Sequence, residues 1–189
     1  MLANFFRGCC LALVGVLSVV SLWISLGSAP ALAELNDDHY DGNIFALYAG
    51  NGSIVPPRFN LAQSFKQDKP TLLFFYADDS RDSKLFASVV SQLQAPYGRA
   101  ANFVAIAADS VPVKDSYDKT EAGYYFQNAV PHTVIFDKDN NEVYNKIGQV
   151  PYEEIDDKLR EVFDLLPRTE SVELRRRSFN EVNTELVPD

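Results

Sequence analysis

The clearest pattern of hydrophobic and polar positions lies between residues 70 and 93. Residues 71–76 form a short apolar run of β-forming side chains, which predicts a buried strand. Residues 78–82 are polar and carry the signals of a turn and a helix start. Apolar residues then recur at helical spacing, at Leu85, Phe86, Val89, Val90 and Leu93. The pattern predicts a strand that enters a helix through a tight polar turn, and open α/β sheets bind and react at such turns.

The pattern after this unit predicts a mixed sheet. Residues 102–107 are a second buried strand, and residues 133–136 and 142–147 form an antiparallel pair around a polar turn. Residues 152–166 place apolar side chains on one helical face. Strands and helices in this order predict an α/β fold with a central mixed β-sheet flanked by helices.

The segments around the sheet are less regular. Residues 43–48 are expected to add a strand, and Asn60 is expected to cap a short helix that runs through Phe65. Residues 109–123 have little pattern and are interpreted as an insertion near the turn. Tyr124-Tyr125-Phe126 are expected to pack at the end of a short helix.

The N-terminal run predicts export across a membrane. Residues 8–29 contain no charge, Arg7 precedes them, and Ala31-Leu32-Ala33 fits a signal-peptidase site. An uncleaved anchor is the alternative, because the run approaches the ~20 residues that span a bilayer. The expected organisation is as follows: a signal peptide or anchor at 1–33, an extension at 34–59, the α/β domain at 60–167 and a tail at 168–189.

Charge and cysteine content narrow the function classes. Without residues 1–33 the chain has 16 basic and 26 acidic residues, a formal charge of −10. Such an acidic body argues against general nucleic-acid binding, which depends on neutralising phosphates. The two cysteines, Cys9 and Cys10, both lie in the N-terminal run, so the remainder has no thiolate and no disulfide. We expect no cofactor and no metal site, since the two histidines are also far apart in sequence.

Two motifs resemble thioredoxins. Tyr76-Ala77-Asp78-Asp79, followed by Ser80-Arg81-Asp82-Ser83-Lys84, resembles the stretch that leads into Cys-Gly-Pro-Cys-Lys, with serine at both cysteine positions. Ala129-Val130-Pro131-His132-Thr133 resembles the segment whose proline is cis and faces the active site, and Gly148 matches a later glycine. The resemblance covers roughly residues 60–166 and implies a thioredoxin-like fold with a cis Val130–Pro131 bond.

A narrower resemblance covers nearly all of the chain after residue 33. It rests on motifs that together resemble a cyanobacterial family described as thylakoid-membrane photosystem I accumulation factors. These motifs are Asn36-Asp37-Asp38, residues 41–48, Asn51-Gly52-Ser53, Val55-Pro56-Pro57-Arg58, residues 78–82 and residues 163–168. The resemblance implies a thylakoid membrane or lumen location and photosystem I subunits or assembly intermediates as partners.

The degenerate turn argues against thiol chemistry. A thioredoxin needs a thiolate at a helix N-terminus, whereas Ser80 and Ser83 are alcohols and Phe74 replaces the family's buried acid. We therefore expect that the chain is neither a thiol oxidoreductase nor an enzyme of another class. The alternative is a ligand- or glutathione-binding enzyme of thioredoxin fold in which Ser80 donates a hydrogen bond. A Ser80–His132 hydrolase pair lacks an elbow motif and an orienting acid.

Binding is the function that does not need sulfur. The groove beside the expected cis-proline, with Asp79, Val130, Pro131 and His132, is the predicted contact for a polypeptide, because thioredoxin-like domains pair this edge with extended backbone. Asp78, Asp79 and Asp82 are interpreted as local helix-start acids rather than cation ligands. Arg175, Arg176 and Arg177 in the tail are a predicted contact with anionic lipid or an acidic partner. The alternative is that the tail docks on the domain and these arginines pair with nearby glutamates.

Overall fold

The computed structural model describes residues 34–171, and it contains one four-stranded mixed sheet. The strands are β1 (Thr71–Tyr76), β2 (Asn102–Ala107), β3 (His132–Phe136) and β4 (Glu142–Ile147), in the spatial order β2-β1-β3-β4. β1 is parallel to β2 and antiparallel to β3, and β3 is antiparallel to β4. Every residue of β1 is buried, as the apolar run predicts for a central strand.

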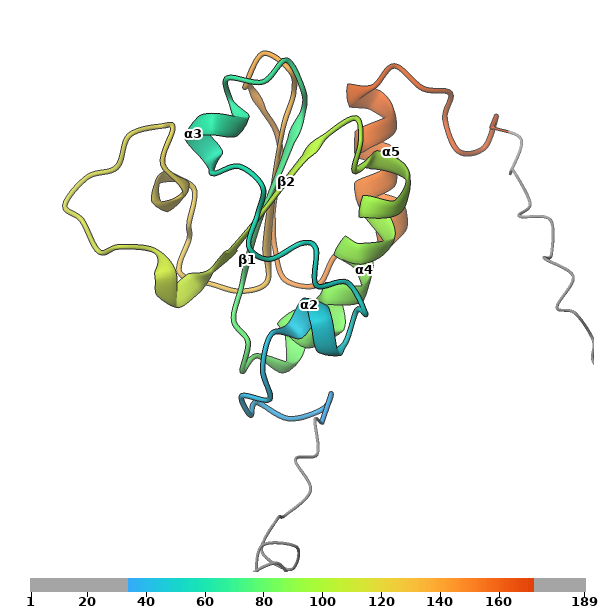
Figure 1. The fold of residues 1–189 in the computed structure, drawn as a ribbon. Coiled ribbons are helices and arrows are strands. Elements are labelled where there is room, and N and C mark those ends of the chain that lie inside the picture. Colours follow the sequence, from blue (N-terminus) through green and yellow to red (C-terminus); the bar gives the residue numbers. More distant parts are fainter. Residues whose placement is uncertain (1–33, 172–189) are drawn as a thin grey trace, which may run out of the picture. The chain divides into compact units, whose positions relative to one another are not determined.

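Alternation along β1 divides the core between two faces of the sheet. Leu72, Phe74 and Tyr76 pack on one face against α4 (Arg81–Tyr97), α5 (Tyr152–Val162) and α2 (Ile44–Leu47). Leu73 and Phe75 pack on the other face with α3 (Leu61–Ser64). Figure 1 shows α4 and α5 together on one side and α3 with the long loop after β2 on the other. Full burial of such side chains contributes about 1.5–3 kcal/mol each.

Strand directions, the helical crossover between β1 and β2, and the flanking helices confirm the expected α/β thioredoxin-like fold. The Val130–Pro131 bond is cis, as expected, and Val55–Pro56 is a second cis bond. Asn60 caps α3 through a capping box with Gln63, and Phe65 closes that helix, which confirms the local prediction. Tyr125 packs edge-on against Phe136, after a 3-10 turn at Ala122–Tyr124, as expected for the aromatic cluster.

Two element predictions were wrong. Residues 43–48 do not add a strand, because Asn43 caps a helix, α2, with its side chain. The last helix stops at Val162, four residues before the predicted end, because Asp164 turns to a φ of 52° and Leu165 N then bonds back to Arg160 O at 2.8 Å, which closes the helix. Both errors arise where local hydrogen bonds override the apolar pattern.

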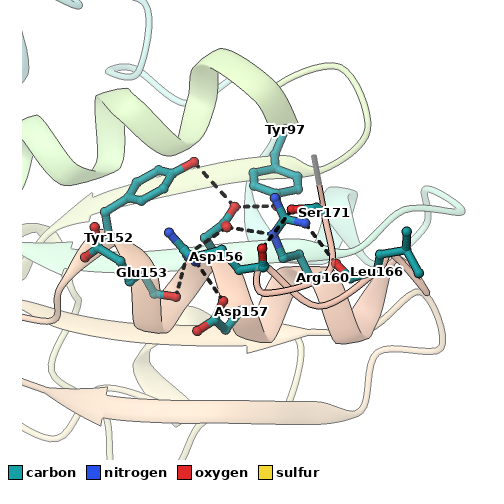
Figure 2. A network of polar contacts seen from close by, with 9 residues as sticks. Tyr97, Tyr152, Glu153, Asp156, Asp157, Arg160, Leu166 and Ser171 are labelled. Carbon is teal, nitrogen blue, oxygen red and sulfur yellow. Dashed lines mark hydrogen bonds and ion pairs between the residues drawn. The ribbon is translucent and has the colours of Figure 1, made fainter. Parts of the chain in front are cut away.

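The chain after α5 returns onto that helix through a polar network centred on Asp156 (Figure 2). Asp156 accepts hydrogen bonds from Tyr97 Oη at 2.6 Å, Arg160 Nε at 2.8 Å and an Arg168 guanidinium nitrogen at 2.8 Å. Arg168 also reaches Asp157 Oδ1 at 3.1 Å. Residues 167–171 therefore pack on the domain rather than leaving it at Pro167.

Within residues 34–171 no helix has both the length and the apolar character needed to cross a bilayer. The predicted signal peptide or anchor at residues 1–33 and the predicted contact at Arg175, Arg176 and Arg177 lie outside the described residues.

Candidate functional site

The serine turn between β1 and α4 is held by its own two hydroxyl groups. Ser80 is the N-cap of α4, and its Oγ accepts a hydrogen bond from Ser83 N at 3.2 Å. Ser83 is buried, and its Oγ accepts from Ala77 N at 3.2 Å. Both hydroxyls therefore close the turn by accepting backbone N–H groups.

The segment before α2 covers the N-terminus of α4. Asp38 Oδ1 accepts from Arg81 N at 2.9 Å, which is the first backbone N–H of α4. Asp78 Oδ1, in the turn, accepts from Ile44 N at 3.0 Å, the first N–H of α2. The two segments thus cap each other's helices, and each carboxylate lies where the helix dipole favours negative charge.

Lys84 joins these two segments inside the fold. Its side chain is fully buried, and Nζ lies 2.7 Å from Asp41 Oδ2 and 3.1 Å from Asp37 Oδ1. The ring of Tyr48 lies 5.4 Å from Nζ. Burial acts to lower the pKa of Lys84, but its hydrogen bonds to Asp41 and Asp37 raise it above the ordinary value. Residues 37–48 are therefore held against the turn by a buried ion pair, which we call the lysine latch.

The sequence analysis missed the latch, although its signals were present. Lys84 is adjacent to the buried face of α4, and Asp37 and Asp41 are concentrated just upstream of a short helix. A buried lysine needs carboxylate partners. Sequence separation alone does not show that acids more than forty residues away supply them.

The structure links the serine turn to the cis-proline corner through the chain around Gly148. Pro131 O accepts from Gly148 N at 2.7 Å, and Asp82 Oδ1 accepts from Gln149 Nε2 at 2.8 Å. Val130 is half-buried and packs against the core, whereas Asp79 is exposed. The serine turn, with Ser80 and Asp82, and the predicted groove residues Val130 and Pro131 thus belong to one corner of the domain.

His132 does not join that groove. It is fully buried and pairs in register with Phe75, so its side chain lies on the face of the sheet opposite α4. Its ring stacks on Phe75 at 5.4 Å, and Nε2 lies 2.7 Å from Asn145 Oδ1. The Ser80–His132 pair considered for hydrolase chemistry is therefore not formed, although the proline is cis.

Asp82 lies in the first turn of α4, as interpreted from the sequence, but the hydrogen bonds of Asp78 and Asp82 reach segments distant in sequence. Asp78 is bound to α2 and Asp82 to Gln149. Burial, together with the neighbouring charges of Asp109 and Asp79, raises the pKa of Asp78, against the lowering effect of Ile44 N. Among residues 34–171 no group of three or more histidine, cysteine, aspartate or glutamate side chains is placed to hold a metal ion.

A second site, which the sequence analysis did not predict, lies at the free edge of β2. A cleft of about 630 Å³ opens between the carboxyl-terminal half of β2, the segment around the second cis-proline and the loop at residues 110–123. We call it the edge cleft. Its apolar walls come chiefly from Val55, Pro56, Pro57, Ile106, Val111 and Pro112. The predicted insertion thus forms a wall of this cleft, and its role was not visible without the sheet order.

The chain was compared with protein-family models, solved structures and curated proteins. No protein-family model matches the chain. Among solved structures it is similar to mitochondrial thioredoxin 3 of Saccharomyces cerevisiae, with 22% identity, a TM-score of 0.40 and coverage of 53% of this chain and 83% of the other. The thioredoxin Deadhead of Drosophila melanogaster gives 18% identity, a TM-score of 0.37 and coverage of 50% and 82%.

An extensive relative is the thylakoid membrane protein slr1796 of Synechocystis sp. The two sequences are 50% identical over 157 residues, which cover 83% of this chain and 78% of the relative. The matched length is greater than that of the sheet domain alone, in agreement with the motifs found before residue 60 and after residue 162. This chain therefore belongs to the family of the thylakoid membrane protein slr1796.

Proposed function

We propose that this chain is a redox-inactive, thioredoxin-like factor that supports photosystem I accumulation at the thylakoid membrane by binding protein subunits or assembly intermediates. The observation that carries the proposal is the use of Ser80 and Ser83 as backbone caps in the turn where a thioredoxin holds its reactive cysteines. The turn is fully formed, and its two serine hydroxyl groups cap backbone N–H groups where a thioredoxin would present a thiolate nucleophile.

The chemistry of the turn supports a binding role. A cysteine starts from a pKa of about 8.5, so a helix N-terminus can make it a thiolate. The pKa of an alcohol starts many units higher, near that of water, so a helix N-terminus leaves a serine protonated at neutral pH. Serine also forms no disulfide, and residues 11–189 contain no cysteine. Reduction of a client disulfide therefore has no electron donor in this domain.

The same corner argues against a glutathione-type site. Ser80 Oγ accepts Ser83 N, and Asp38 already binds Arg81 N. A ligand thiolate that binds the first N–H of α4 would have to displace the Asp38 carboxylate, which belongs to the segment that the lysine latch holds through Asp37 and Asp41. Protein binding needs no such displacement.

Location and partner are proposed from family membership. The relative is named a thylakoid membrane protein, and the motifs of this chain resemble thylakoid photosystem I accumulation factors. We propose that residues 1–33 direct or anchor the chain at the thylakoid membrane or in its lumen. The acidic body suits a protein partner better than nucleic acid.

The test is replacement in Synechocystis. A strain lacking slr1796 is expected to lose photosystem I, measured by P700 absorbance, while photosystem II stays near its normal level. This chain should restore photosystem I, and so should its variant with Cys9→Ser and Cys10→Ser. Unchanged photosystem I in the deletion strain, or restoration that depends on either cysteine, contradicts the proposal.

A further inference from the structure

The outer edge of β2 has no backbone partner in the described part of the chain. β2 ends the sheet, with β1 on one side, and no backbone hydrogen bond joins it to residues 53–60, which run beside it. Pro56 and Pro57 in that segment have no N–H to donate. In a parallel pair, alternate residues turn both N–H and C=O away from the partner strand, so this edge offers donors and acceptors in a row.

The edge cleft lies directly along these groups. Ala105, Ile106 and Ala107 of β2 form its floor, and Tyr117 and Thr120 stand in the opposite wall. Its volume of about 630 Å³ falls in the range of sites that enclose a ligand. An occupant that fills the cleft therefore also lies within reach of the free strand edge.

Charge at one end of the cleft favours a cationic occupant. Asp78, Asp79 and Asp109 follow the carboxyl ends of β1 and β2, where Tyr76, Ala107 and Ser110 line the cleft. Among the described residues none of the three carboxylates forms a salt bridge with a lysine or arginine. The charges of Asp109 and Asp79, in addition to burial, act to raise the pKa of Asp78.

We propose that the edge cleft binds an extended, basic peptide segment of a partner protein, which adds to β2 as a strand. The backbone satisfies the free edge, apolar side chains enter the cleft, and a lysine or arginine lies near Asp109 and Asp79. A compact small molecule would fill the cleft and leave the edge unpaired. The inference rests on the proposed function, and it identifies the surface that binds the partner and the chemical class of the partner segment.

The probe is a labelled eight-residue peptide in which valine alternates with arginine and threonine. Binding to the full chain in detergent is measured by fluorescence anisotropy, and the site by amide hydrogen exchange. We expect new protection at the outward-facing amides of Phe103, Ala105 and Ala107, because Asn102 N bonds to Pro70 O and the alternate residues 102, 104 and 106 therefore face β1. A peptide N-methylated at alternate residues keeps the side chains but loses donors, so its binding should fall at least about tenfold. A peptide with glutamate for arginine should also bind more weakly.

Matched variants locate the site. Thr120→Trp places an indole in the cleft from an exposed position and should weaken binding at least about tenfold, whereas Ser116→Trp, on the same loop outside the cleft, should not. Asp109→Asn should weaken binding about threefold and reduce its salt dependence, while Asp115→Asn should change neither. Circular dichroism checks that all four variants stay folded.

Several outcomes overturn the proposal. These are absence of binding, binding that survives Thr120→Trp, and protection of the Ala129 and Val130 amides in place of β2. Protection of β2 in the absence of peptide also overturns the proposed occupant. If this protection disappears in the variant with Arg175→Gln, Arg176→Gln and Arg177→Gln, the occupant is the tail. If the protection increases with protein concentration, the occupant is a second copy of the chain. The deletion strain tests the proposed function separately, so failure of the peptide experiment leaves that result standing.

Discussion

Replacing Asp156 by asparagine tests the network that returns the chain onto α5. Asp156 is 3% exposed and accepts three short hydrogen bonds, from Tyr97, Arg160 and Arg168 (Figure 2). The substitution Asp156→Asn would keep the size of the side chain but remove its charge and put an amide beside two guanidinium groups. The change therefore leaves both arginines without their shared carboxylate.

The expected loss of stability follows from how deeply the partners of Asp156 are buried. Hydrogen bonds to charged groups are worth about 1.5–3 kcal/mol, but Arg160 and Arg168 are 23% and 35% exposed, so water screens part of each contact. We expect a loss of about 3 kcal/mol in the free energy of unfolding. For a domain of about 140 residues this lowers Tm by roughly 10 °C.

The same variant has a pH signature. Burial acts to raise the pKa of Asp156, but hydrogen bonds from Tyr97 and Arg160 and the charges of Arg160 and Arg168 lower it below the ordinary 3.8. A depressed folded pKa stabilises the protein above about pH 3.8 and loses that effect as pH falls through the folded pKa. The difference between wild type and Asp156→Asn should therefore be full near pH 7 and shrink in acid.

The assay is urea unfolding of the full chain in detergent, followed by far-ultraviolet circular dichroism from about pH 7 to about pH 3. Asp157→Asn is the control, because Asp157 is 57% exposed and contacts Arg168 alone within the network. It should cost no more than about 0.5 kcal/mol. A loss below about 1 kcal/mol for Asp156→Asn, or equal losses for both variants, refutes the reasoning.

Three further predictions concern the turn and the tail. In an insulin-reduction assay with dithiothreitol, the full chain carrying Cys9→Ser and Cys10→Ser should match the no-protein control, and turnover clearly above that control would show a redox activity that the serines do not explain. Ser80→Ala should lower the free energy of unfolding by about 1 kcal/mol through loss of the α4 N-cap, and Ser80→Asp should restore most of that loss. Photosystem I should stay near its normal level with both variants. Loss of photosystem I with a stable Ser80→Asp protein would require a role for the hydroxyl group itself. Each tail arginine near an anionic surface contributes about 1 kcal/mol to membrane binding. The full chain should therefore float with anionic liposomes more strongly than a variant with Arg175→Gln, Arg176→Gln and Arg177→Gln, and moderate salt should remove the difference. Equal flotation of both proteins excludes a membrane role for the arginines.

Short-range patterns determined much of this fold. The buried run of β1 and the helical repeat of α4 are visible in the sequence because each element repeats its apolar side chains at its own period. The central strand needs apolar side chains on both faces, whereas the helix needs them on one. The cap of α3 by Asn60 was predictable for the same reason, since the cap and the helix lie within four residues. The thioredoxin resemblance added the fold and the cis Val130–Pro131 bond.

Only the tertiary structure decided which residues meet. Asn43 and Asp78 jointly start a helix where a strand was expected, and Asp78 is distant in sequence. His132 follows the cis-proline but points to the far face of the sheet, because its register with Phe75 fixes its side. Lys84 is buried because Asp37 and Asp41 fold over it, and the edge cleft exists because β2 ends the sheet. Pairing between distant segments leaves no periodic signal in either one, so the sequence by itself specified the elements while their packing specified the candidate sites.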